Sequence, residues 1–147
     1  MEHCFFCDQQ NGIVPSVGGA IYADDLVYAS HMFNPSEPTY LGYLALQTRR
    51  HIHHWADLTP AEASAIGLLL MRLSRALKAG LGVDHTYVVY YAEVVPHFHV
   101  LLTARYAGTP EAYWRDKVHD WSQAPKGGAT EVATLCDKLR TYLLQTN

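Results

Sequence analysis

The chain has 147 residues, of which 49% are hydrophobic and 17% charged, and its formal net charge is −3 at pH 7. This composition favours one globular domain over residues 1–147 and argues against disorder, nucleic-acid binding or adsorption to an anionic membrane. No apolar stretch approaches the length of a membrane span. The first residues lack a signal-peptide pattern, and three cysteines are too few for a secreted disulfide framework, so we expect a cytoplasmic protein.

Three strands are predicted in the first third of the chain. The segments Ile21–Ala23 and Leu26–Ala29 flank Asp24–Asp25, and aspartates suit the turn of a hairpin. Residues 34–38 contain two prolines, which restrict the backbone and indicate a loop. The segment Tyr40–Gln47 then predicts a third strand.

The strongest local signal predicts a long helix that begins after Thr59. Thr59 and Glu62 have the spacing of a capping box, and Pro60 occupies the first helical position. Gly80 and Gly82 are expected to end the helix. Its apolar stripe comprises Ile66, Leu69, Leu70, Leu73, Ala76 and Leu77.

Two strands and a second helix follow. The strands are predicted at His85–Tyr91 and His97–Thr103, and the helix runs from about Thr130 to Leu144. The residues expected to face inward from this helix are Val132, Leu135, Leu139 and Leu143. Together the elements predict an α+β domain, an antiparallel sheet backed by helices.

Two histidines at spacing two lie in the apolar segment 96–102. On a strand, His97, His99 and Leu101 share one face, while Phe98, Val100 and Leu102 face a core. A neutral imidazole at His99 is competent as a nucleophile or general base. The alternative is a structural histidine whose ring nitrogen bonds to a backbone carbonyl.

A metal site is suggested by Cys4 and Cys7, a Cys-x-x-Cys pair, together with His51 and His97. Zinc favours four such ligands in a tetrahedral arrangement. The alternative is a buried cysteine pair or a redox motif. The rival histidine ligands are His3, His53 and His54.

The order of several motifs resembles the histidine triad (HIT) superfamily, in particular a bacterial branch. The resemblance spans nearly the whole chain. It is carried by Cys4–Cys7, the hairpin 21–29, Arg49–His51 followed by Ala56–Thr59, the signature-like Pro96–Leu102, Arg105–Pro110, and the tail with Trp121 and Ala124–Gly128.

The resemblance implies a fold and a chemistry. The fold is a five-stranded antiparallel sheet with one long helix and a C-terminal helix, usually in a homodimer. Residues 1–20 would form a zinc-knuckle segment and residues 105–147 a C-terminal extension. His99 would attack the α-phosphorus of a purine nucleotide or nucleotide conjugate, forming a nucleotidyl-histidine. Cys4, Cys7, His51 and His97 would hold a structural zinc ion.

Several positions depart from the family pattern. Leu101 replaces the third signature histidine, which contacts substrate in the family, and Tyr43 stands where many members have a histidine. Glu93 lies in a tract that is often rich in phosphate-binding amides, and Asn34 is the candidate for contacting the ribose. Two functions therefore compete: a HIT-type nucleotide hydrolase or nucleotidyl transferase, which we favour, and a weakly active or inactive zinc-containing nucleotide-binding or interaction protein.

Overall fold

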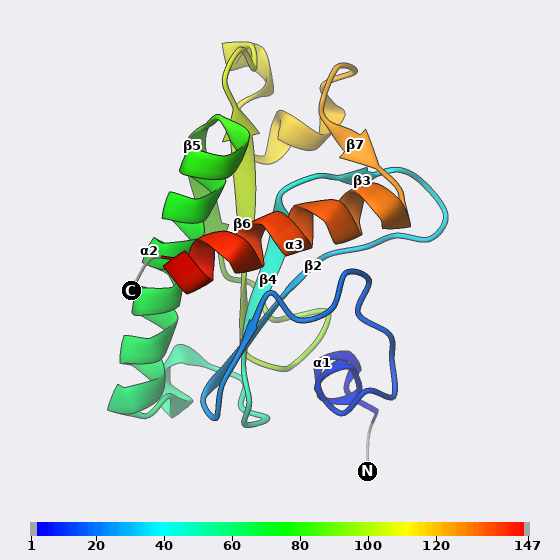
Figure 1. Cartoon of the computed structure of the whole chain (residues 1–147). Coiled ribbons are helices and arrows are strands. Elements are labelled where there is room, and N and C mark those ends of the chain that lie inside the picture. The colour runs from blue at the N-terminus through cyan, green and yellow to red at the C-terminus, as the bar shows by residue number, and fades with distance from the viewer. Residues whose placement is uncertain (1–2, 146–147) are drawn as a thin grey trace.

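The computed structural model describes residues 3–145, so the outermost residues of the expected 1–20 segment and 105–147 extension lie outside the described residues. Five antiparallel strands form the main sheet, in the order β1-β2-β4-β6-β5 (Figure 1). Their bounds are Tyr22–Ala23 (β1), Val27–His31 (β2), Tyr43–Thr48 (β4), Val83–Val89 (β5) and His99–Tyr106 (β6). The predicted α+β class, with its five-stranded antiparallel sheet, is confirmed.

The long helix α2, Pro60–Leu81, follows the prediction closely. Thr59 caps it, accepting a hydrogen bond from the backbone N–H of Glu62, whose side chain accepts one from the Thr59 N–H. Gly82 ends the helix with φ at +66°, a left-handed conformation that glycine adopts without a steric penalty. Gly80, expected to help end the helix, lies inside it.

Helices α2 and α3, the latter spanning Ala129–Gln145, cover one face of the sheet. Figure 1 shows α3 crossing α2 beside the sheet. The core that they share with the strands contains Phe98, Val100 and Leu102, as the alternation along this segment predicts. The opposite face of the sheet, which carries His99 and Leu101, is therefore the face available for a site. No helix among residues 3–145 is long and apolar enough to cross a membrane.

The predicted strand Tyr40–Gln47 is divided in two. Thr39–Tyr40 forms β3, which pairs with β7, Lys126–Gly127, in a separate two-stranded sheet. The break lies at Gly42, whose φ is +93° and where an added Cβ would lie 2.8 Å from the Cβ of Ala104. Only glycine fits this turn and this close approach, so the main-sheet strand starts afresh at Tyr43.

Other elements were shifted or missed. Strand β5 begins two residues earlier than predicted. Strand β6 begins two residues later than predicted, so His97 precedes it. The short helix α1, Phe5–Gln10, lies on the sheet face opposite α2 and was not predicted. The 3₁₀ turns were also not predicted; they are η1 (Trp55–Asp57), η2 (Glu111–Tyr113) and η3 (Arg115–Asp120).

Candidate functional site

Two cysteines and two histidines from three separate segments meet where the central strand β4 ends and the central strand β6 begins. Cys4 and Cys7 come from the start of α1, His51 follows β4, and His97 precedes β6. Cys4 Sγ lies 3.4 Å from His97 Nδ1, and Cys7 Sγ lies 3.4 Å from His51 Nδ1. The two Nδ1 atoms are 3.3 Å apart, and one ligand atom from each residue falls within 4.8 Å of all the others.

These separations match the edges of a zinc tetrahedron. Zinc–sulfur and zinc–nitrogen bonds of about 2.3 and 2.0–2.1 Å place sulfur and nitrogen about 3.5 Å apart, and two nitrogens about 3.3 Å apart. The His97 Nε2–H donates to the Thr48 carbonyl at 2.7 Å, which leaves the Nδ1 lone pair facing the cluster. The residues present therefore fit a zinc ion held by four protein ligands.

The charge states of the cluster also suit a cation. Burial, with the neighbouring Cys4, raises the pKa of Cys7 to about 11, so this thiol stays protonated until a positive charge arrives. Burial lowers the pKa of His97, with smaller contributions from neighbouring histidines, so its ring is neutral. A neutral imidazole is the form that binds metals.

The rival histidines take other places. Among residues 3–145, the four residues above are the one group of His, Cys, Asp or Glu gathered closely enough to hold a metal. His53 Nε2 lies 3.3 Å from His51 Nε2, the ring nitrogen of His51 on the side away from the cluster. His3 is exposed and faces Asp8.

His99, the first residue of β6, lies beside the cluster with one ring nitrogen committed. Its Nδ1 lies 2.7 Å from the His97 carbonyl oxygen, which can only accept, so Nδ1 carries the proton and Nε2 presents a lone pair. Burial lowers the pKa of His99 and keeps this neutral form. The Phe6 ring packs 4.5 Å away between centroids, and His99 is only 9% exposed.

A buried amide network, which the sequence did not reveal, secures α1 against the sheet. Gln47, opposite His99 in the β4–β6 register, donates to Gln9 Oε1 at 3.1 Å. Gln10 Nε2 in turn donates to Gln47 Oε1 at 3.1 Å and to the Thr48 carbonyl at 2.9 Å. These bonds hold the cysteine-bearing helix over the histidines. The regular amphipathic patterns used to find helices carry no signal for such a network.

The two predicted substrate contacts lie in different cavities. Leu101 packs against the small apolar cluster that contains Phe6 and lines a cavity of about 320 Å³. Asn34 lines another, of about 420 Å³. Its amide donates to Glu37 at 3.0 Å and accepts from the Ser36 N–H at 2.9 Å, so it is engaged within its own loop.

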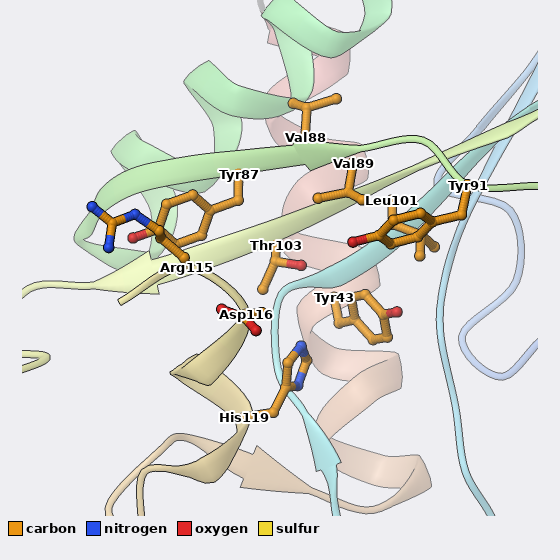
Figure 2. A pocket seen from close by; sticks show the side chains of 10 residues that line it. All are labelled: Tyr43, Tyr87, Val88, Val89, Tyr91, Leu101, Thr103, Arg115, Asp116 and His119. Carbon is orange, nitrogen blue, oxygen red and sulfur yellow. The ribbon is translucent and has the colours of Figure 1, made fainter. Parts of the chain in front are cut away.

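That the C-terminal extension lines the cavity at Leu101 was also not predicted from the sequence. The 3₁₀ segment η3 places Arg115, Asp116 and His119 around the cavity that Leu101 lines (Figure 2). The His119 ring lies 4.9 Å from the rings of both Tyr40 and Tyr43, between centroids. Segment η3 thus packs against residues about 75 positions earlier in the chain, and no local sequence motif predicts this contact.

Comparison with solved structures finds the same architecture. A Zn-bound histidine triad family protein from Mycobacterium smegmatis superposes with a TM-score of 0.70 at 20% identity, over 97% of this chain and 94% of that one. A hypothetical histidine triad nucleotide-binding protein from Sulfolobus tokodaii superposes with a TM-score of 0.74 at 15% identity, over 97% and 93%. A histidine triad protein from Bradyrhizobium japonicum does so with 0.66 at 25%, over 84% and 89%.

The sequence comparisons find no such match. No protein-family model and no curated protein matches this sequence. The similarity is thus one of structure, and it agrees with the strand order and helix positions described above. The chain has the histidine triad fold.

Proposed function

We propose that this chain is a HIT-type nucleotide hydrolase or nucleotidyl transferase that acts at the α-phosphate through a nucleotidyl-histidine on His99. The observation that carries the proposal is the neutral His99 ring, whose Nδ1 proton is held by the His97 carbonyl while Nε2 keeps its lone pair. The structural neighbours described as histidine triad and nucleotide-binding proteins support it.

The proposed reaction has two displacements. The His99 Nε2 lone pair forms a bond to the α-phosphorus, and the bond from phosphorus to the leaving group breaks, its electron pair going to the leaving group, which takes a proton from solvent. Water then attacks the same phosphorus, releases a proton to solvent and frees His99 with a nucleoside monophosphate. An acceptor hydroxyl in place of water would make the reaction a transfer.

The Nδ1 hydrogen bond has a defined role in both steps. As Nε2 bonds to phosphorus the ring becomes positively charged, and the His97 carbonyl stabilises the Nδ1 proton of that cation. The lowered pKa keeps the nucleophile unprotonated at neutral pH. The hydrogen bond comes from the backbone just before β6, whereas the lowered pKa comes from burial, which outweighs the opposite effect of that bond.

We propose that zinc bound by Cys4, Cys7, His51 and His97 is structural. Four protein ligands close a tetrahedral site and leave no position for water or substrate. Bound zinc would supply a cross-link between α1, the end of β4 and the turn before β6. The Zn-bound neighbour from M. smegmatis supports this assignment.

The nucleoside would lie beside α1. A largely apolar cavity of about 380 Å³ lies between Phe5 of this helix and the segment 31–35, a size typical of ligand sites. Phe33 lines both this cavity and the one that contains Asn34. We therefore assign the purine base to the cavity beside Phe5. Asn34 would contact the ribose by exchanging its exposed hydrogen bond to Glu37, and Leu101 would lie on the leaving-group side.

We also propose a homodimer with a continuous sheet. Strand β5 is at the edge of the described sheet, and Val88 on it is about half exposed, which is typical of a strand that finds a partner. Light scattering should then give a molar mass of about twice the 16.5 kDa of one chain. A monomer at micromolar concentration would contradict this part of the proposal.

A second candidate, a binding protein without turnover, has its own support. Phe6 covers His99, and Leu101 offers no hydrogen bond to a phosphate. This candidate expects nucleoside monophosphates to raise the melting temperature, because a ligand that binds only the folded state stabilises it. It expects no product at any enzyme concentration.

The deciding experiment is turnover of a fluorogenic adenosine 5′-phosphoramidate by the parent, His99→Ala and Lys138→Ala. We expect His99→Ala to lose at least about 10³-fold in kcat, because the nucleophile is gone, and Lys138→Ala, altered on the exposed side of α3, to match the parent. Equal activity in the parent and His99→Ala would refute the mechanism. Absence of turnover in zinc-loaded parent, with a thermal shift by AMP, would select the binding protein.

A further inference from the structure

We propose that the cavity around Tyr43, Tyr87, Tyr91 and Leu101 is a subsite for an uncharged aromatic leaving group. The proposal rests on the proposed function and narrows its substrate class to nucleotides whose leaving group carries an uncharged aryl ring, for which phosphoramidates serve as the test compounds. Figure 2 shows these side chains around the cavity, with η3 opposite the strands.

The cavity lies one step along β6 from the proposed nucleophile. His99, Leu101 and Thr103 point to the same face, and successive members of such a row are about 7 Å apart. Leu101 contacts the apolar cluster around Phe6, which covers His99, and also lines the cavity. A ring joined to the departing nitrogen by a short chain therefore passes over Leu101 into the cavity.

The lining is aromatic and aliphatic. Three tyrosines, from β4, β5 and the loop after β5, surround it, and Val89 and Leu101 form its floor on the strands. Its volume of about 320 Å³ lies at the lower end of the range for small-molecule sites. Tyrosine rings favour stacked or edge-to-face contact with another ring, beyond the gain from burial alone.

The charges disfavour a phosphate chain. Arg115 and Asp116 both line the cavity, and their formal charges offset each other. Burial, together with nearby Lys126, lowers the pKa of His119, so its ring adds no positive charge at neutral pH. Recognition of a polyphosphate leaving group requires an excess of cations, which this lining lacks. An uncharged ring is the better match.

The backbone at the mouth of the cavity is strained. Arg115 has φ at +62°, one of two non-glycine residues with positive φ in the part of the chain that the structure describes. Such a conformation costs about 1 kcal/mol or more and persists where surrounding structure enforces it, often at ligand sites. Arg115 lines the cavity together with Tyr87 (Figure 2). The strained backbone of Arg115 therefore lies at the same place as the aromatic lining.

The test compares two adenosine 5′-phosphoramidates, one of phenethylamine and one of ethylamine. During turnover the phosphorus–nitrogen bond breaks, and the amine leaves with the electron pair and a solvent proton. We expect the parent to favour the phenethyl substrate by about 10-fold in kcat/KM, from burial and ring contact. A parent ratio near one would overturn the subsite.

Tyr91→Ala and Val94→Ala form a matched pair for this test. Both side chains are exposed, 66% and 97%, in the same loop, but only Tyr91 lines this cavity. We expect Tyr91→Ala to lower the preference to about 3-fold or less and Val94→Ala to keep it. A preference that Tyr91→Ala leaves intact would also overturn the proposal. Unchanged melting temperatures verify that both variants fold.

A binding measurement separates failure of the subsite from failure of the proposed function. In His99→Ala, the two phosphoramidates bind without turnover, and we expect a Kd about 10-fold lower for the phenethyl compound. Tyr91→Ala in the same background should remove most of that difference. If the parent turns over neither substrate but this Kd ratio holds, the function fails and the subsite stands. Equal Kd values refute the subsite, whatever the activity.

Discussion

The two regions on either side of His99 differ in chemistry although they lie on the same face of the sheet. On one side, Cys4, Cys7, His51 and His97 converge with the separations of a zinc tetrahedron. On the other side, a cavity is lined mainly by tyrosine and aliphatic side chains, with Leu101 at the position where the sequence departs from the family pattern. The Cys/His cluster and the surface that lines this cavity therefore have separate chemical requirements.

The difference has a physical basis. A four-ligand zinc site has no partial solution, because removing one ligand would leave the buried Cys4 thiol and His97 imidazole without the metal that they share. A cavity lining tolerates replacement of single side chains, since Leu101 packs against the apolar cluster around Phe6 and brings no polar group that needs a partner. The first region thus depends on all four residues together, whereas the second can vary one side chain at a time.

Removing the metal ligands should have the largest effect. In Cys4→Ser/Cys7→Ser we expect zinc content to fall from about one per chain to none, and Tm to drop by about 10 °C as α1 loses its cross-link. Elemental analysis of untagged protein and calorimetry provide the measurements. The control His3→Ala alters an exposed histidine outside the cluster and should retain zinc. Zinc that persists in the double variant would identify other ligands.

A polar group introduced at Leu101 should have the next largest effect, because it changes the apolar character of the cavity side of His99. We expect Leu101→Gln to raise kcat for the ethylamine phosphoramidate about 10-fold, because the amide donates a hydrogen bond toward charge that develops on the phosphate. Leu101→Met keeps the site apolar and serves as the control in the same steady-state assay. A glutamine variant no faster than the methionine variant would show that this position does not face the phosphate.

The smallest effect is expected at the ion pair that supports the His51 segment. Arg50 binds both carboxylate oxygens of buried Glu62, at 2.6 and 2.8 Å. The Arg50 hydrogen bond lowers the pKa of Glu62 to about 2. Because Arg50 is half exposed, we expect Glu62→Gln to cost only about 1–2 kcal/mol at pH 7.

The contribution of this ion pair to stability should depend on pH. Ionised Glu62 stabilises the fold above its ordinary pKa of 4.5, and its contribution declines as the pH falls from there toward 2. Urea unfolding at pH 7, 4 and 3 should therefore show a shallower acid loss in Glu62→Gln than in the parent. Glu111→Gln, on exposed η2, is the control. Equal slopes in the variant and the parent would contradict the role assigned to the pair.

Local signals predicted the elements whose causes are local. The capping box of Thr59 and Glu62 marked the start of α2, and the alternation from Phe98 to Leu102 separated the core face from the site face. The prediction of one continuous strand over 40–47 was wrong, because the break at Gly42 depends on its close approach to Ala104, a contact between distant segments. Short α1 and the 3₁₀ turns are too brief for helical periodicity to be informative.

The candidate site divides in the same way. By itself the sequence determined which side chains are able to bind zinc or attack phosphorus, because ligand type and nucleophilicity belong to the residue. Only the tertiary structure decided that His3 and His53 lie outside the cluster, that His99 is neutral with Nε2 unprotonated, and that η3 closes a cavity over Leu101. Those outcomes depend on burial and on contacts between segments up to about 90 residues apart, which no local pattern encodes.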